Sequence, residues 1–166
     1  MKILNLEPDN YSKDAKKILD KIGEVFEYQY SREELIDNIS TFNVLIVRLG
    51  HKIDKEILCK ADNLKYILSA TTGLNHIDCN YCHDKGIQVV SLKNEISFLN
   101  HIHATSEHTW ALVLSLIRKI PQAFESVRKN NWDRDVFKGS ELNGKTLGII
   151  GLGRIGKKVA NFGRHF

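Results

Sequence analysis

The chain up to residue 90 alternates short apolar runs with segments that carry the period of an amphipathic helix. This alternation favours a parallel sheet, because parallel neighbours have to be joined by a crossover, which is usually a helix. Helices on both faces of such a sheet make a doubly wound α/β domain of the flavodoxin-like kind, with an expected strand order of 2-1-3-4-5. The expected strands are residues 2–6, 24–30, 43–49, 64–70 and 87–90, the second of them near an edge.

Residues that cap helix N-termini precede three helices expected in this region. Ser12 precedes the first, Ser31–Glu34 forms a capping box before the second, and Asp54 precedes the third. A fourth, short helix is expected over residues 79–85. The apolar face of the first helix consists of Ala15, Ile18, Leu19 and Ile22.

Residues 92–103 show no clear period, and we expect an irregular crossover there. Thr105 or Ser106 then caps a long helix that runs to about residue 120. This helix is apolar on nearly every face, so we expect it to be buried on both sides. Pro121 starts the next helix in its first turn, where the missing N–H has no cost.

A G-x-G-x-x-G motif follows a further apolar run, Leu147–Ile150. We expect a buried parallel strand, a turn and a helix, and this context favours a dinucleotide-binding turn over a purely structural one. Gly151 allows the tight bend, Gly153 lets a pyrophosphate approach the backbone, and Gly156 lets the helix pack closely. The free N–H groups at the start of the helix attract phosphate.

The composition, with 42% hydrophobic and 27% charged residues, is that of an ordinary globular protein. The net charge of +4 comes from residues spread along the chain, so we expect no nucleic-acid partner. The longest apolar stretch, residues 110–117, is too short to span a bilayer, and we expect no membrane partner. Three cysteines and no secretory signal indicate the reducing cytoplasm.

Two groups of metal-ligating residue types stand out, and we interpret both as structural. Cys79 and Cys82 form a C-x-x-C pair beside His76, Asp78 and His83. A zinc site commonly needs a second such pair, which this sequence lacks, so we expect no metal. The second group, interpreted as loop and helix-start residues, consists of His101, His103 and His108.

Several motifs in collinear order resemble one enzyme family. They are Leu45–Arg48, Ala70–Asp78, Ser106–Thr109, Arg118–Ala123 and Glu141–Gly156. The set resembles the D-isomer-specific 2-hydroxyacid dehydrogenases, most closely their phosphoglycerate-dehydrogenase-like branch. The resemblance implies a substrate-binding domain over residues 1–103 and the start of an NAD-binding Rossmann domain over residues 104–166.

The family transfers a hydride between NAD and a 2-hydroxy or 2-oxo acid. By resemblance, Thr71, Thr72 and Gly73 receive the substrate carboxylate on backbone N–H groups, and Arg48 reaches an anionic group such as a phosphate. Arg48 also follows a strand at the carboxyl edge of the sheet, where ligands bind in such folds, although a solvated charge is an equal alternative. The family's usual G-x-G is Thr71-Thr72-Gly73 here, and the crossover after residue 92 is longer than in many members, so the substrate is left open.

The resemblance also implies the cofactor contacts. Arg154 and Ile155 match residues that meet the pyrophosphate, and Thr72 matches a position close to the nicotinamide. The expected NAD-binding residues are Thr72, Gly151, Gly153, Arg154, Ile155 and Gly156.

The family's catalytic His, Glu and Arg would follow Phe166, as would the carboxylate that binds the ribose, so we predict no catalytic residue here. We expect an N-terminal portion of a dehydrogenase, inactive alone, acting on a 3-phosphoglycerate-like or glyoxylate/hydroxypyruvate-like acid. The resemblance further implies a homodimer through the helices of residues 105–130. The alternatives are a non-catalytic dimerisation or nucleotide-binding module and, more weakly, an NAD-sensing corepressor.

Overall fold

The computed structural model describes residues 1–166 and divides them into two compact units, Met1–Ile96 and Ser97–Phe166. We refer to these as unit 1 and unit 2 and describe each by itself. No helix in either unit has the length and apolarity needed to cross a membrane.

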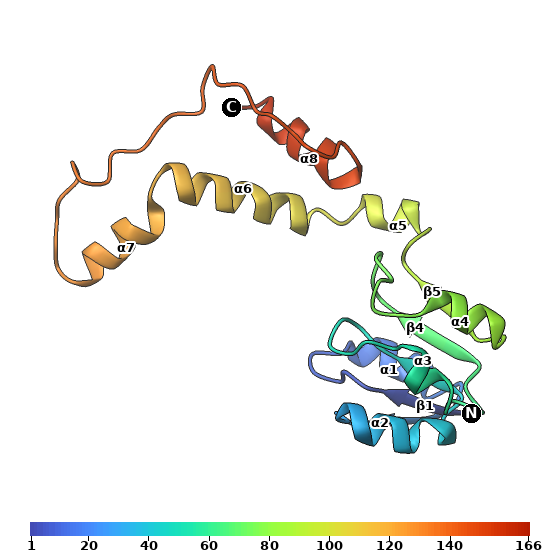
Figure 1. Cartoon of the computed structure of the whole chain (residues 1–166). Coiled ribbons are helices and arrows are strands. Elements are labelled where there is room, and N and C mark those ends of the chain that lie inside the picture. Colours follow the sequence, from blue (N-terminus) through green and yellow to red (C-terminus); the bar gives the residue numbers. More distant parts are fainter. The chain divides into compact units, whose positions relative to one another are not determined.

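Unit 1 is built on a five-stranded, fully parallel sheet with the order β2-β1-β3-β4-β5. Figure 1 labels β1, β4 and β5 of this sheet. The expected α/β fold and the expected strand order are therefore confirmed. β2 lies at one edge of the sheet, as its alternating sequence predicts. The strands are β1 (Lys2–Asn5), β2 (Glu24–Glu27), β3 (Val44–Ile46), β4 (Tyr66–Ser69) and β5 (Gln88–Ser91).

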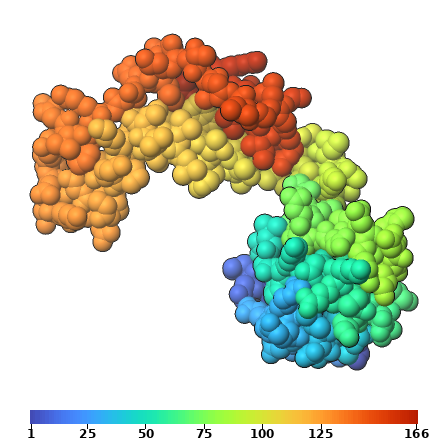
Figure 2. All heavy atoms as spheres, viewed as in Figure 1, coloured from blue at the N-terminus to red at the C-terminus, as the bar shows by residue number.

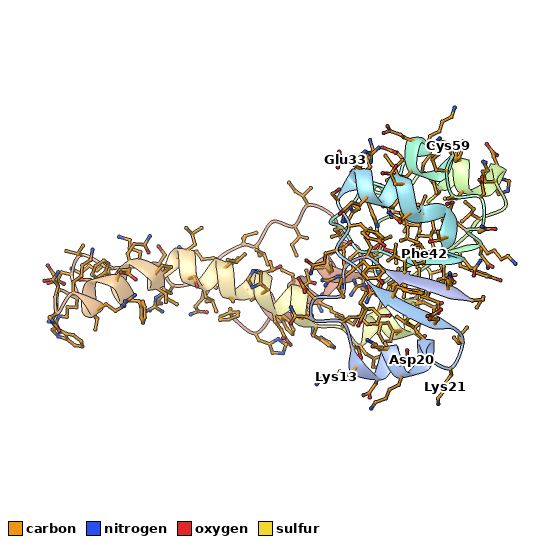
Figure 3. The ribbon with its side chains drawn as sticks, turned by 90° about the horizontal axis from the view of Figure 1, so that it is seen from below. Lys13, Asp20, Lys21, Glu33, Phe42 and Cys59 are labelled. Atoms are coloured by element: carbon orange, nitrogen blue, oxygen red, sulfur yellow. The ribbon has the colours of Figure 1, made fainter.

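Helices cover both faces of this sheet. Alternate side chains of the strands point to opposite faces, and both faces carry apolar residues that have to be buried. Ile3 packs with Leu19 of α1 (Lys13–Leu19) on one face. Leu4 belongs to the larger core on the other face, which α2 (Arg32–Asn38), α3 (Lys55–Leu58) and α4 (Cys79–Asp84) cover. Figure 3 shows α1 and α2 on opposite sides of the strands.

Two of the three helix caps predicted in unit 1 are confirmed. Ser12 accepts a hydrogen bond from the N–H of Ala15 at the start of α1. Ser31 and Glu34 form a reciprocal capping box at the start of α2, with distances of 3.2 and 2.8 Å between backbone nitrogen and side-chain oxygen. These local hydrogen bonds satisfy N–H groups that have no partner inside the helix.

The predicted cap at Asp54 is wrong in its chemistry. Asp54 occupies the N-cap position of α3 but makes no capping hydrogen bond. Both of its carboxylate oxygens instead accept from Nη2 of Arg32 in α2, at 2.9 Å each. The Asp54 side chain therefore joins two helices rather than closing one.

The predicted apolar face of α1 is only partly buried. Leu19 is in the core, but Ile18 is 60% exposed and Ile22 is 52% exposed. The helix ends at Leu19, so Ile22 lies beyond its last turn. The apolar pattern therefore continues three residues past the end of the helix that forms.

The segment expected to be an irregular crossover contains a short helix, α5 (Ile96–Asn100). At five residues it is too short to show a helical period in the sequence. Nζ of Lys158 holds its end, donating to the carbonyl oxygens of Asn100 and Ile102 at 2.6 and 2.8 Å. Cations near the C-terminus of a helix satisfy carbonyl groups that lack intrahelical partners.

Unit 2 continues with α6 (Ala104–Ile117), α7 (Ile120–Arg128) and α8 (Arg154–Gly163). Pro121 lies in the first turn of α7, as predicted. The predicted cap of α6 is wrong, because the helix starts one residue before Thr105 and the hydroxyl of Ser106 donates back to the carbonyl of His103 at 2.7 Å.

The expectation that α6 is buried on both sides is also wrong. Trp110 is buried, but Leu112 and Leu116 are 58% and 77% exposed. The buried side packs on α8, where the indole N–H of Trp110 donates to the carbonyl of Val159 at 3.0 Å.

The buried strand predicted over Leu147–Ile150 does not form. These residues lie outside any strand, and both Leu147 and Ile150 are exposed. A strand exists only through hydrogen bonds to a neighbour, and unit 2 has no other strand with which to pair. The apolar run alone therefore does not determine the structure here.

Candidate functional site

The carboxyl ends of β3 and β4 carry the predicted acid-binding residues of unit 1. These two strands are direct neighbours, so the loops that follow them start at the same edge of the sheet. Arg48 follows β3, is exposed, and has a guanidinium group that enters none of the ion pairs in the structure. Its positive charge is therefore available to an anion.

The loop after β4 is braced by a row of hydroxyl groups. Oγ1 of Thr71 donates to the carbonyl oxygen of Gly73 at 2.8 Å and lies 2.9 Å from Oγ of Ser69. A hydroxyl carries one hydrogen, so Ser69 must donate to Thr71. Nε2 of His76, 3.3 Å from the Ser69 hydroxyl, is then the donor to Ser69. Thr71, which replaces a glycine of the family pattern, thus ties the loop to the end of the strand.

The outer part of the same loop is open. Thr72 and Gly73 are exposed, and no atom lies within 4 Å of the position that a Cβ on Gly73 would occupy. The backbone N–H groups of these two residues donate to no protein atom. Free backbone donors and a free guanidinium on loops at the same edge of a sheet are a chemically suitable combination for a carboxylate or phosphate.

Sequence reasoning missed Glu7, which follows β1. Its carboxylate accepts hydrogen bonds from the backbone N–H groups of Arg48 and Gly50, at 2.7 and 3.2 Å. The available signal was an acidic residue shortly after an interior strand of a parallel sheet, at the edge where ligands bind.

The glycine motif of unit 2 forms a turn whose three glycines have different surroundings. Gly151 has a φ of +90°, which disfavours other residues. A Cβ on Gly156 would lie 2.2 Å from the carbonyl oxygen of Gly151, whereas a Cβ on Gly153 would meet nothing within 4 Å. The turn therefore needs glycine at its bend and under its helix, and it is open at the middle position.

The N-terminus of α8 begins directly after this open glycine. Gly153 is the N-cap and supplies no side-chain hydrogen bond, and the first helical hydrogen bond runs from the N–H of Lys157 to the carbonyl of Gly153. The N–H groups of Arg154, Ile155 and Gly156 are consequently free of intrahelical partners. This arrangement suits an anion such as a pyrophosphate.

Arg154 has a second contact within unit 2. One of its guanidinium nitrogens donates to the carbonyl oxygen of Leu99 at 3.0 Å, while the adjacent Ile155 is 36% exposed. Arg154 is thus the first residue of α8, and part of its hydrogen-bonding capacity is used on the end of α5.

The C-x-x-C pair lies on α4, where the Cys82 side chain is buried. Burial raises the pKa of the Cys82 thiol to about 11. A thiol with so high a pKa is protonated near neutral pH and is a poor nucleophile and metal ligand. None of the chain's His, Cys, Asp and Glu side chains cluster in threes in a way that could hold a metal ion.

Comparison with known families gives the class of the chain. Residues 4–135 match the model for the D-isomer specific 2-hydroxyacid dehydrogenase catalytic domain, and residues 110–166 match the model for the NAD binding domain of the same enzymes. The chain belongs to this family. Family members are NAD-dependent oxidoreductases of 2-hydroxy acids, so the resemblance carried by the motifs is confirmed.

Curated relatives of this family are similar along the whole chain. D-3-phosphoglycerate dehydrogenase of Methanocaldococcus jannaschii is 41% identical over 167 residues, covering 100% of this chain and 30% of the relative. The enzyme of the same name from Archaeoglobus fulgidus is 43% identical over 164 residues, which cover 96% of this chain and 29% of the relative. The chain therefore spans about 30% of the length of these family relatives.

Solved structures of similar fold come from enzymes with different substrates. An acyclic imino acid reductase in complex with NADPH and D-Arg has a TM-score of 0.82 at 31% identity, covering 99% of this chain and 53% of that one. D-lactate dehydrogenase from Aquifex aeolicus, complexed with NAD and lactic acid, has a TM-score of 0.82 at 28% identity. The match covers 99% of this chain and 48% of that one.

Proposed function

We propose that the whole protein transfers a hydride between NAD and a 2-hydroxy or 2-oxo acid, and that unit 1 binds the acid. The proposal is carried by two features on loops that follow neighbouring strands: the guanidinium of Arg48, which is in no ion pair, and the free N–H groups of Thr72 and Gly73. The backbone donors suit the carboxylate that every such acid carries. Arg48 suits a second anionic group.

A phosphorylated acid of the 3-phosphoglycerate kind is the substrate class that this arrangement favours. Bidentate pairing makes Arg a strong phosphate binder, and no carboxylate of the chain competes for Arg48. Two curated relatives with the name D-3-phosphoglycerate dehydrogenase, at 41% and 43% identity, support this choice. A glyoxylate- or hydroxypyruvate-like acid would use the backbone donors and leave Arg48 with a smaller role.

The residues of unit 2 fit the pyrophosphate of NAD. The open position over Gly153, the bend at Gly151 and the free N–H groups at the start of α8 form a cradle in which a phosphate can contact the backbone. Bound NAD supplies the hydride chemistry. The residues described here would hold its pyrophosphate, with Arg154 and Ile155 beside it.

Calorimetric titration of the chain with 3-phosphoglycerate and with glycolate tests the acid site. We expect Arg48→Ala to weaken binding of 3-phosphoglycerate by about tenfold to a hundredfold, because a charged hydrogen bond contributes about 1.5–3 kcal/mol. Binding of glycolate should change much less. Lys52→Ala removes the same charge a few residues along and should leave both affinities unchanged. Equal loss in both variants would mean that only net charge matters and would contradict the proposed site.

We further propose that the protein is a homodimer through the helices of residues 105–130. Unit 2 exposes apolar side chains along α6 and α7. In Figure 2, which is coloured by residue number, α7 and the loop that follows it are orange. Apolar side chains clustered in this way are typical of an interface. The exposed residues are Leu112, Leu116, Ile120, Phe124 and Val127.

Sedimentation of matched charge variants tests the dimer. Phe124 in α7 and Ile18 in α1 are exposed to nearly the same degree, 61% and 60%. We expect Phe124→Asp to convert the protein to a monomer and Ile18→Asp to leave it a dimer. A dimer that survives the change at Phe124 would contradict the proposed interface.

A further inference from the structure

Glu7 connects two segments of unit 1 that are far apart in the sequence. It lies just after β1, and its Oε1 accepts from the backbone nitrogens of Arg48 at 2.7 Å and of Gly50 at 3.2 Å. The fit is close, because a Cβ added to Gly50 would lie 3.2 Å from the carboxyl carbon of Glu7. The loop that follows β3 is thus fitted around this carboxylate.

The contact begins where the sheet hydrogen bonds end. The N–H of Leu6 donates to Ile46, and the N–H of Val47 donates to Leu68, each at 3.0 Å. Beyond these bonds the backbone N–H groups of residues 48 and 50 have no neighbouring strand to donate to. They donate to the carboxylate of Glu7 instead. A carboxylate that accepts backbone N–H groups forms charge-assisted bonds, which are about twice as strong as neutral ones.

The Glu7 carboxylate holds the backbone of Arg48 without neutralising its side chain. Neither residue takes part in an ion pair anywhere in the structure. The backbone of Arg48 is therefore fixed while its guanidinium remains free, which is the combination that a preorganised anion contact requires.

We infer that Glu7 is a positioning residue, which fixes the loop of residues 48–50 and so directs Arg48 toward the anionic group of the substrate. This inference rests on the proposed function, in which Arg48 contacts that group. The direction in which anion affinity changes when Glu7 is replaced separates positioning from simple electrostatics. Removing a negative charge near an anion site should strengthen anion binding by Coulomb's law, whereas loss of positioning should weaken it.

Calorimetric titration of the chain with 3-phosphoglycerate makes this test. We expect Glu7→Ala to weaken binding about fivefold to tenfold, and Glu7→Gln, which keeps a neutral acceptor, to weaken it about twofold to threefold. In an Arg48→Ala background, Glu7→Ala should have no further effect, because it acts through Arg48. Asp9→Asn removes a nearby exposed carboxylate that accepts no hydrogen bond from the loop, and it should leave the affinity unchanged or slightly higher.

Amide hydrogen exchange of the same variants tests the loop itself. Exchange at residues 48 and 50 should become about tenfold faster in Glu7→Ala, while exchange at Leu6 and Val47 should stay slow and show that the sheet is intact. Unchanged exchange at 48 and 50 would overturn the inference, as would tighter ligand binding in Glu7→Gln. Binding that is lost in Arg48→Ala but normal in both Glu7 variants would overturn the inference and leave the proposed function standing. If the unaltered chain does not bind 3-phosphoglycerate, both fail.

Discussion

Asn5 and Ser69 are buried polar residues at the ends of strands in unit 1, and they differ in how their side chains are satisfied. Ser69 shares hydrogen bonds with Thr71 and His76 and thereby fixes the loop after β4. Neither the amide nitrogen nor the amide oxygen of Asn5 has a partner. A buried amide without hydrogen bonds destabilises the folded state, so Asn5 is a weak point of the core.

Replacing Asn5 with leucine, which has a similar shape, should therefore stabilise the chain. We expect the free energy of unfolding to rise by about 1–2 kcal/mol, since the cost of burying the amide disappears. Ser69→Ala, which removes a satisfied hydroxyl, should lower it by about 1 kcal/mol. Urea unfolding measures both changes. A loss of stability in Asn5→Leu would show that the amide is hydrogen-bonded to water in solution.

The sequence could predict that Arg48 and Thr71 lie at one edge of the sheet, where the acid site is proposed, but it could not predict the contact of Glu7 with that loop. Arg48 and Thr71 follow apolar runs that read as parallel strands, and the carboxyl ends of parallel strands meet at one edge. The contact of Glu7 joins residues 41 and 43 positions apart. The pattern of neighbouring residues cannot predict such a contact, because the contact depends on the register of β1 against β3.

At the scale of elements, one ion-pair network links α2 and α3. Nη2 of Arg32 donates to both oxygens of Asp54 at 2.9 Å and to Glu56 at 2.6 Å. The hydrogen bond from Arg32 holds the pKa of the Asp54 carboxyl below its ordinary value, against the opposing effect of desolvation. A group whose pKa is lowered by folding stabilises the folded state only while it is ionised.

This network should make a small, pH-dependent contribution to stability. Arg32→Gln should lower the free energy of unfolding only slightly at pH 7, because both partners are partly exposed and screened. The stabilisation is present above the ordinary Asp pKa of about 4 and is lost as the pH falls through the lower folded-state value, so the variant and the unaltered chain should converge near pH 2. Lys17→Gln, which breaks an exposed pair in α1, should change little at either pH. A difference that persists at pH 2 would contradict the ionic origin.

The glycine turn of unit 2 offers a matched pair of substitutions. Gly156→Ala places a methyl group 2.2 Å from the carbonyl of Gly151, so the start of α8 must shift, and we expect loss of helix and of nucleotide binding together. A methyl group on Gly153 meets no protein atom, so Gly153→Ala should keep the helix and weaken only binding of NADH. Circular dichroism and NADH fluorescence separate the two effects. Equal helix loss in both variants would show that the open position over Gly153 is structural.

The parallel sheet and the capping box of α2 formed as predicted, whereas two features of the segments around unit 2 did not. The alternation of apolar runs predicted the sheet and its order, and the capping box at Ser31 was readable because all its parts lie within four residues. The strand at 147–150 needed a neighbouring strand, and α5 is held by Lys158, more than fifty residues away. Periodicity could predict neither outcome, because each depends on tertiary contacts.

At the scale of the whole molecule, two compact units carry two different parts of one proposed reaction. Unit 1 presents a cation and free backbone donors at the carboxyl edge of a parallel sheet, and unit 2 presents a glycine turn opening a helix. Parallel α/β sheets bind ligands at that edge because the strand ends and their loops converge there. Membership of the dehydrogenase family is consistent with both features.

The most direct test of the acid site is a ¹⁵N–¹H NMR titration of the chain with 3-phosphoglycerate. The backbone amides of Arg48, Thr72 and Gly73 should shift together, with one common dissociation constant, because loops after two neighbouring strands bind one ligand. The amides inside α7 (Ile120–Arg128), which are hydrogen-bonded within the helix, serve as an internal control and should stay in place. If the amides at 48, 72 and 73 do not move, or move with different affinities, the acid site proposed here is wrong.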